Sequence, residues 1–294
     1  NQPLFLGPGP QAGFNPYARI IVEEAHRRGI DVQVDDADAG LFTLSHGGRR
    51  VRCRESLSDL TSAISMTLCQ DKSLTHKVLR AAGLKLPAQQ LAGSADDNLE
   101  FLDEHRRIVV KPLDGEQGQG VAVDLQHIEE VQQAIEAARQ FDSRVLLESF
   151  HQGLDLRILV IGFEVVAAAI RRPAEVVGDG QHSIRALIEA QSRRRQAATD
   201  GESKIPLDAE TERTLHAAGH DYSSILPRGA QLAVRRTANL HTGGCLEDVT
   251  DILHPTLVDA AVRAARALDI PMVGLDLMVP AADQPEYVFI EANE

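Results

Sequence analysis

The sequence predicts an α/β protein with α+β parts, and three segments carry this prediction. Residues 4–34 contain an apolar run, a helix that opens at Asn15-Pro16 and an alternating strand. Residues 71–148 alternate helix and strand around a glycine-rich loop. Residues 156–170 form two strand-like runs joined by a glycine turn, which is typical of an antiparallel hairpin. This succession predicts small layers of helices packed on sheets.

Length and composition are those of an ordinary globular protein. The chain has 294 residues, 43% hydrophobic and 25% charged, which is enough for a core and one to three subdomains. The net charge of −13 argues against a nucleic-acid binder, but a few local cations and N–H groups can still hold ATP. No apolar run approaches the roughly 20 residues of a membrane span. The three cysteines form no CxxC pair, which predicts reduced thiols in a cytoplasmic protein.

The loop that follows Lys111 is the first candidate site. Lys111 ends an apolar strand, and Gly115, Gly118 and Gly120 lie in the next turn. Glycines let backbone N–H groups approach phosphate oxygens, and a lysine adds a charge for the same anion. The loop is neither a Walker A sequence nor a Rossmann fingerprint. Taken alone, it is more typical of a glycine-rich hairpin turn.

Acidic and amide residues at the end of the chain form the second candidate site. Asp276 lies inside an apolar strand, and Glu291 and Asn293 share one face of another. Two carboxylates and an amide oxygen suit Mg²⁺. A carboxylate in an apolar strand is costly unless it is paired or bound to a cation, so Asp276→Asn should leave the metal-free protein as stable or more stable. The alternative is an edge strand that ends in solvent.

The segment from Glu148 to Arg157 is the third candidate. A strand leads to a turn at Gly153, with acids on both sides and an arginine after it. A strand-edge backbone with flanking acids could recognise an adenine amino group and ribose hydroxyls, and Arg157 could hold a phosphate or carboxylate. These residues could equally be surface charges.

Ten short motifs between Thr61 and the end of the chain occur in one order, among them Asp71-Lys72-Ser-Leu-Thr75, Arg171-Arg-Pro-Ala174 and Glu291-Ala-Asn293. Together they resemble ATP-grasp ligases, most of all the cyanophycin synthetase group, with the fused glutathione synthetases nearby. The resemblance implies an ATP-grasp fold, in which two α+β lobes clasp ATP. It implies a pre-ATP-grasp α/β domain over 1–69, an N-terminal lobe with a glycine flap over 70–149, and a C-terminal lobe over 150–294. The implied C-terminal lobe carries a surface insertion over 172–235 and is truncated at its end.

The resemblance also implies an ADP-forming ligase that joins a carboxylate to an amine through an acyl phosphate, with ATP and Mg²⁺ as cofactors. The residues that it implies for ATP are Lys72 and Lys111 for the α- and β-phosphates, Gly115, Gly118 and Gly120 for the flap, Glu148, Ser149 and His151 for adenine, and Asp155 for ribose. The implied magnesium ligands are Asp276, Glu291 and Asn293. The implied stabilisers of the γ-phosphate or acyl phosphate are Arg157, Arg236 and Asn239.

Two departures bear on the substrate. The flap reads Gly-Glu-Gln-Gly-Gln-Gly where cyanophycin synthetases commonly have Asn-His and an Arg, and His241 replaces a common Ser. We therefore expect a small amino-acid or dipeptide substrate, with N-acetylglutamine and glutamine as the leading pair. We also expect the nearer resemblance to be to the ligase half of N-acetylglutaminylglutamine synthetase, which would imply an upstream acetyltransferase-like domain. No nucleic-acid or membrane partner is expected, and a homo-oligomer stays open.

Two hypotheses of other classes compete with the ligase. One is a non-catalytic nucleotide-binding module, and the other is a structural α/β domain without a ligand. The two lysines and the complete set of metal ligands count against the first. The second leaves Asp276 in its apolar strand unexplained.

Overall fold

The computed structural model describes residues 14–114, 120–199 and 201–293. Its helices are α1 (Pro16–Arg27), α2 (Ala63–Gln70), α3 (Lys72–Ala81), α4 (Ala95–His105), α5 (Ile128–Ala138), α6 (Ile184–Ala198), α7 (Ala209–Ala217) and α8 (Pro255–Leu268), with a 3₁₀ turn, η1 (Thr250–Ile252). Its strands are β1 (Asp31–Asp36), β2 (Leu41–His46), β3 (Arg49–Arg54), β4 (Leu57–Ser58), β5 (Gln89–Leu91), β6 (Ile108–Pro112), β7 (Ala122–Leu125), β8 (Val145–Ser149), β9 (Leu154–Ile161), β10 (Glu164–Arg172), β11 (Glu175–Val177), β12 (Gln231–Ala233), β13 (Cys245–Asp248), β14 (Met272–Val279) and β15 (Val288–Asn293). The predicted fold class, a mixed α/β protein, is confirmed, and its sheets are antiparallel.

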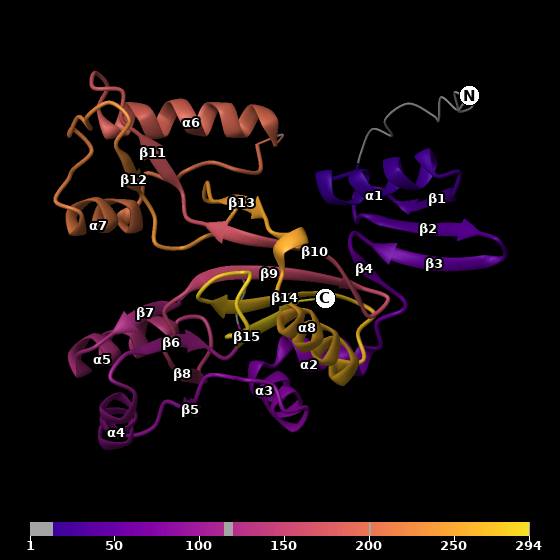
Figure 1. Ribbon diagram of the computed structural model, residues 1–294, viewed down its shortest axis with the longest axis horizontal. Helices are drawn as coiled ribbons and strands as arrows, with labels where there is room; N and C mark the ends of the chain where they lie inside the picture. Colours follow the sequence, from indigo (N-terminus) through magenta and orange to yellow (C-terminus); the bar gives the residue numbers. More distant parts are fainter. Residues whose placement is uncertain (1–13, 115–119, 200, 294) are drawn as a thin grey trace.

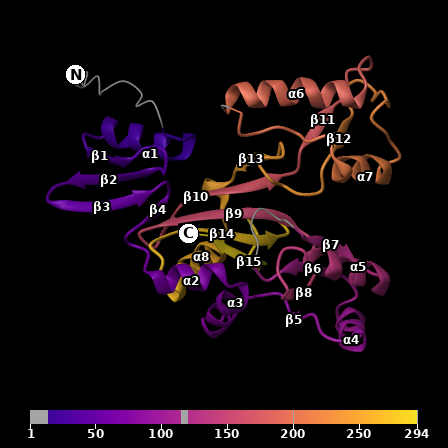
Figure 2. The ribbon, with the colours of Figure 1, turned by 180° about the vertical axis from the view of Figure 1, so that it is seen from behind.

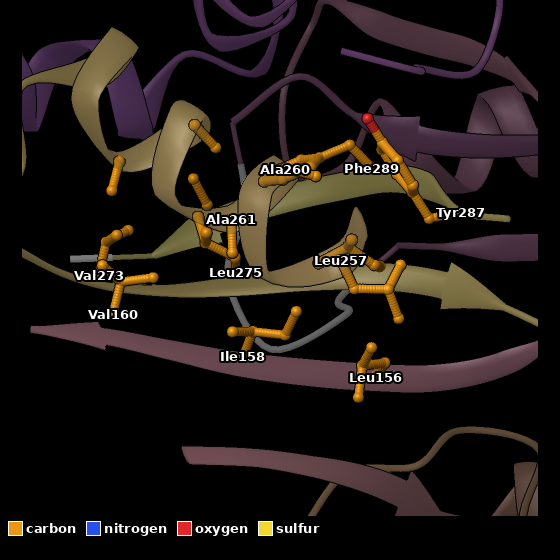
Figure 3. Packing of buried hydrophobic residues seen from close by; sticks show 14 of the residues in the cluster. Leu156, Ile158, Val160, Leu257, Ala260, Ala261, Val273, Leu275, Tyr287 and Phe289 are labelled. Carbon is orange, nitrogen blue, oxygen red and sulfur yellow. The ribbon is translucent and has the colours of Figure 1, made fainter. Parts of the chain in front are cut away.

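The central sheet has the strand order β13-β10-β9-β14-β15. Helix α8 covers one face, with α2 and α3 beside it (Figure 1). Successive side chains of a strand point to opposite faces of the sheet. One face of β9 and β14 can therefore be apolar while the other face carries charged side chains. On the covered face Leu156 and Leu275 pack with Leu257 and Ala261 of α8 (Figure 3). Full burial of each leucine stabilises the fold by about 2 kcal/mol.

A second sheet lies beside the central one and has the order β5-β8-β6-β7. Helices α4 and α5 cover one of its faces (Figures 1 and 2). Ile108, Val110 and Leu147 are fully buried there against Val131 of α5. This sheet therefore repeats the arrangement of the central one, with an apolar face under helices and a face left for polar residues.

Two smaller layers complete the fold. Strands β1 to β4 form an antiparallel sheet that packs on α1, with Phe42 and Ala18 in its core. Strands β11 and β12 pair with each other and pack against α6 and α7 around Ile188 and Leu215. Because the second sheet and the insertion each have their own cluster of buried residues, we propose that the division near residue 150 and the insertion over 172–235 mark structural units. The division near residue 70 has no such support, because Cys69 of α2 and Leu79 of α3 both pack in the cluster of the central sheet. The strand expected within residues 4–10 lies outside the described residues.

No helix in the described part of the chain is both long and apolar enough to cross a membrane. No disulfide joins Cys53, Cys69 or Cys245 within the described part of the chain.

Candidate active site

The uncovered face of the central sheet carries a row of charged side chains. Arg157 of β9, Asp276 of β14 and Glu291 of β15 are register partners across three adjacent strands, so their side chains share this face. Asn293 pairs with Gly274 and lies on the same face. Asp276 and Glu291, predicted as metal ligands from the sequence, are thus brought side by side.

Asp276 is 5% exposed and is surrounded by donors. Arg157 Nη1 lies 2.9 Å from its Oδ1, and Arg171 Nη2 lies 3.1 Å from its Oδ2. Asn293 Nδ2 donates to the same Oδ2 over 3.3 Å. The carboxylate is therefore paired in the metal-free protein. The expectation that its removal would be neutral or stabilising took it to be unpaired, which was wrong.

Arg171 joins Asp276 to Asp155. Its Nε and Nη2 donate to Asp155 Oδ1 over 3.1 Å and 2.8 Å. Burial raises the pKa of Asp155, although the guanidinium opposes that shift, while the pKa of Arg171 is raised by Asp276 and Asp155 against the effect of burial. The sequence prediction for Asp155 was a ribose contact, and here the carboxylate holds an arginine. Arg171 was given no role from the sequence, although its place in one of the ten ordered motifs could have suggested one.

Gly274 makes room for the guanidinium of Arg157. A Cβ at this position would lie 2.5 Å from Cζ and Nε of Arg157, closer than side-chain atoms can approach. The absence of a side chain therefore lets Arg157 lie over β14 and reach Asp276. No other residue type has the same effect without displacing the guanidinium.

We expect Gly274→Ala to act through Arg157. The guanidinium is the far end of a flexible side chain, so it can move and the fold should keep its melting temperature within a few degrees. Its contact with Asp276 should be lost, and turnover should fall about tenfold or more, as for Arg157→Met. In an Arg157→Met background, Gly274→Ala should have no further effect on the rate. Independent losses in the double variant would contradict this coupling.

The polar face of the second sheet carries the other predicted lysine. Gln89, Glu148 and Val109 are register partners on β5, β8 and β6, and Lys111 is two residues from Val109, so these residues share a face. Lys111 Nζ lies 2.7 Å from Glu148 Oε2, and Gln89 Nε2 donates to the same oxygen over 2.6 Å. The side chains of Lys111 and Glu148 are only 9% and 4% exposed. They form a buried ion pair rather than surface charges.

Lys72 connects the two polar faces. It is the first residue of α3, which is capped by the Asp71 side chain. Its Nζ lies 3.5 Å from Glu291 Oε1 and 3.5 Å from the carbonyl oxygen of Leu113, which follows β6. A pocket lies between α3, β5 and β15, and Lys72, Gln89 and Glu291 line it together with apolar residues such as Leu79 and Phe289. An amide from the second sheet and an acid from the central sheet therefore meet the lysine of α3 here.

The segment after Glu148 is tied to neighbouring backbone. Ser149 Oγ accepts the N–H of Ala88 over 3.0 Å and lies 3.0 Å from Nε2 of His151. The N–H of Phe150 donates to the carbonyl oxygen of Arg107 over 2.9 Å. Burial lowers the pKa of His151. These bonds fix the segment that was predicted to read adenine at the edge of the polar face.

Arg236 and Asn239 lie apart from this cluster. Arg236 is exposed after β12, and Asn239 Oδ1 accepts the N–H of His241 over 2.8 Å, which closes a local turn. Within the described residues neither shares a hydrogen bond or ion pair with Asp276. The neighbouring Arg235 is the buried arginine, 5% exposed, and its Nη1 donates to Asp208 over 2.9 Å. It anchors the strand end to α7.

The flap is only partly described. Gly115 and Gly118 lie outside the described residues. Gly120 has φ +68°, which favours glycine, and a Cβ there would lie 2.7 Å from the Phe141 ring. The backbone conformation and the nearby Phe141 ring therefore require glycine at position 120, apart from any contact with phosphate.

The donor set fits Mg²⁺. Among the described residues no three His, Cys, Asp or Glu side chains form a complete metal cage. Asp276 and Glu291 supply two carboxylates on neighbouring strands, and Asn293 supplies an amide. Mg²⁺ is commonly held by one or two carboxylates, with substrate phosphates and water completing its octahedron. A magnesium site of this kind therefore needs only a few protein ligands, because phosphate oxygens and water supply the others.

The fold and this site define an ATP-grasp protein, and comparisons with known proteins agree. The model of the RimK-like ATP-grasp domain matches residues 69–225. The chain therefore belongs to this family, whose ADP-forming carbon–nitrogen ligases use ATP with Mg²⁺.

Relatives lie among peptide-forming enzymes. Cyanophycin synthetase of Trichormus variabilis is 34% identical over 293 residues, which cover 96% of this chain and 32% of that protein. The bifunctional glutathione biosynthesis protein GshAB of Clostridium perfringens is 29% identical, over 94% of this chain and 37% of that protein. The chain thus spans about a third of the length of these relatives.

Solved structures agree on the fold. The bifunctional glutathione synthetase of Pasteurella multocida has a TM-score of 0.70 and 26% identity, over 96% of this chain and 40% of that one. The D-alanine–D-alanine ligase of Bacillus anthracis, at 16% identity and a TM-score of 0.51 over 79% of this chain and 59% of that one, shares the fold alone.

Proposed function

We propose that this chain binds MgATP between its two polar sheet faces and uses it to join an amino-acid-derived carboxylate to an amino-acid amine. The observation that carries the proposal is the position of Lys72 between the charged residues of the two sheets. Its Nζ contacts Glu291, the register partner of Asp276 on the central sheet. It also contacts the carbonyl oxygen of Leu113, which follows the strand on which Lys111 pairs with Glu148. Phosphate needs cations on one side, and its metal needs carboxylates on the other. A structural domain would have no use for a buried polar set of this size.

The reaction proceeds in two steps. A carboxylate oxygen of the donor attacks the γ-phosphorus of ATP, the bond to the β-phosphate oxygen breaks, and ADP leaves. The amine then attacks the acyl carbon of the acyl phosphate, inorganic phosphate leaves, and the nitrogen loses a proton. When bound, Mg²⁺ would neutralise charge on the phosphates.

The residues have separate tasks in this proposal. Lys72 and Lys111 hold the α- and β-phosphates, and Arg157 offsets the charge that develops at the γ-phosphate. Asp276, Glu291 and Asn293 hold the metal. Glu148, Ser149 and His151 contact the adenine. Family resemblance assigns Asp155 to the ribose, although its carboxylate holds Arg171 here, and assigns Arg236 and Asn239 to the γ-phosphate or acyl phosphate. The glycine flap excludes water, because an acyl phosphate hydrolyses readily.

For the substrate, the comparisons favour a peptide ligase of the cyanophycin or glutathione type over the N-acetylglutaminylglutamine reaction that the sequence first suggested. One observation supports N-acetylglutaminylglutamine synthesis as a second candidate function. His241, at a position where cyanophycin synthetases commonly have Ser, lies 3.3 Å from the Tyr17 hydroxyl and 3.8 Å from Glu202. The imidazole of His241 is larger than a serine side chain. This difference from cyanophycin synthetases supports a different carboxylate donor.

The test is ADP release from MgATP by the full-length protein across donor–amine pairs. The pairs are primed polyaspartate with arginine, γ-glutamyl peptides with glycine, and N-acetylglutamine with glutamine. We expect release with a pair of the first two kinds. Release with the acetylated pair alone would establish the second candidate. MgATP binding without release with any pair would leave a nucleotide-binding module, and no binding of MgATP would contradict the proposal altogether.

A further inference from the structure

The charges around Asp276 are balanced before any metal arrives. Asp155, Asp276 and Glu291 are negative, and the cations that pair with them are Arg171, Arg157 and Lys72. Both oxygens of Asp276 already accept from a guanidinium. A divalent cation that takes Asp276 as a ligand must therefore meet a fixed positive charge within a few ångströms of either oxygen, where repulsion is strong.

One of the two arginines can leave at a lower cost. Arg157 has Asp276 as its carboxylate partner within the described residues. Arg171 has a second carboxylate, because its Nε and Nη2 both reach Asp155 Oδ1. Its Nη2 is shared between Asp155, at 2.8 Å, and Asp276, at 3.1 Å. A small rotation would give Nη2 wholly to Asp155 and would remove the positive charge from Oδ2 of Asp276, leaving there the neutral 3.3 Å hydrogen bond from Asn293 Nδ2.

We propose that Arg171 occupies the metal side of Asp276 in the empty protein and moves onto Asp155 when the cation binds. Asp155 is then a positioning residue that retains Arg171 at the site, rather than a ribose contact alone. The inference rests on the proposed function in taking Asp276 as a metal ligand. It implies that the free cation binds weakly and that the metal enters with the nucleotide, whose phosphates bring the missing negative charge.

The experiment measures Mn²⁺ binding to the intact protein without nucleotide, by the electron paramagnetic resonance signal of free Mn²⁺. Arg171→Met should bind Mn²⁺ about tenfold tighter or more than the wild type, because a full positive charge leaves the ligand. The matched control is Arg172→Met. Arg172 is the next residue, points to the other face of β10 and pairs with exposed Glu247 over 2.8 Å. Arg172→Met should leave the Mn²⁺ affinity within about twofold of the wild-type value. This variant therefore measures the long-range effect of losing one positive charge.

Two further variants keep the test decisive. Arg171→Lys retains the charge but has no planar fork for both carboxylates, so it should tighten Mn²⁺ binding by less than Arg171→Met. Asp155→Asn leaves Arg171 with Asp276 alone, so it should weaken Mn²⁺ binding. If Arg171→Met fails to fold, these two decide. Mn²⁺ affinity unchanged or lowered by loss of Arg171, or raised by Asp155→Asn, would overturn the inference. Because no turnover is measured, a wrong substrate assignment would leave these outcomes unaffected.

Discussion

Replacing Lys111 by Met is expected to lower MgATP affinity and turnover by about 10²–10³-fold, the typical effect of removing one preorganised donor. The same change leaves Glu148 buried, with Gln89 as its remaining side-chain donor among the residues that the structure describes. Breaking a buried ion pair by removing one partner costs about 3 kcal/mol, so the free energy of unfolding should fall while the fold survives. Calorimetric titration with MgATP and urea unfolding measure the two effects.

A second substitution separates the effect on MgATP binding from the effect on stability. Adding Glu148→Gln to Lys111→Met removes the uncompensated charge, so stability should return, and nucleotide binding should not. Lys77→Met is the matched control, because Lys77 is an exposed lysine of α3 and its loss should change neither quantity. If Lys111→Met binds MgATP as the wild type does, Lys111 has no phosphate role.

Asp276→Asn is expected to raise the Mg²⁺ concentration needed for half-maximal turnover and to slow turnover about 10²-fold, because it removes charge from a hard-cation site. It should also destabilise the metal-free protein by about 2 kcal/mol, since hydrogen bonds from Arg157 and Arg171 lose their charged acceptor. Mg²⁺ titrations of the rate and thermal melting in the absence of metal measure these effects.

Glu291→Gln should share the metal effect and have less effect on stability. The Glu291 side chain is 35% exposed, and its 3.5 Å contact with Lys72 is partly screened by solvent. Asp283→Asn, an exposed acid between β14 and β15, is the control and should change neither property. Lower stability in both site variants at an unchanged Mg²⁺ requirement would assign Asp276 and Glu291 a structural role only.

Local signals predicted several elements well. Asn15 caps α1 and Asp71 caps α3 through their side chains, as the preference of these residues for N-caps suggests. The hairpin of β9 and β10 turns at Gly162, which has φ +61°. Helix α4 was not predicted, although Ser94 and Asp97 form a capping box that could have indicated its start. Of its three buried residues, Asn98 is polar, and the two apolar ones, Phe101 and Leu102, are adjacent, so the apolar pattern gives little helical periodicity.

The short antiparallel strands β2 to β4 were also missed. Strand β3 reads Arg-Arg-Val-Arg-Cys-Arg, with Val51 and Cys53 alone facing the core. Two apolar positions are too few for a strand period to stand out from a charged surface run. Its pairing with β2, over Leu41 to His46, supplies the rest of the buried face.

The sequence by itself determined the kind of chemistry in this protein. Alternation along a strand places Glu291 and Asn293 on one face, whatever the strand's neighbours are. Only the tertiary structure decided which groups meet on that face. The pairing of Asp276 with Arg157 and Arg171 depends on the register of β14 against β9 and of β9 against β10. Hydrophobic alternation specifies a strand's inward face, but turns and packing on α8 select its neighbours and its register.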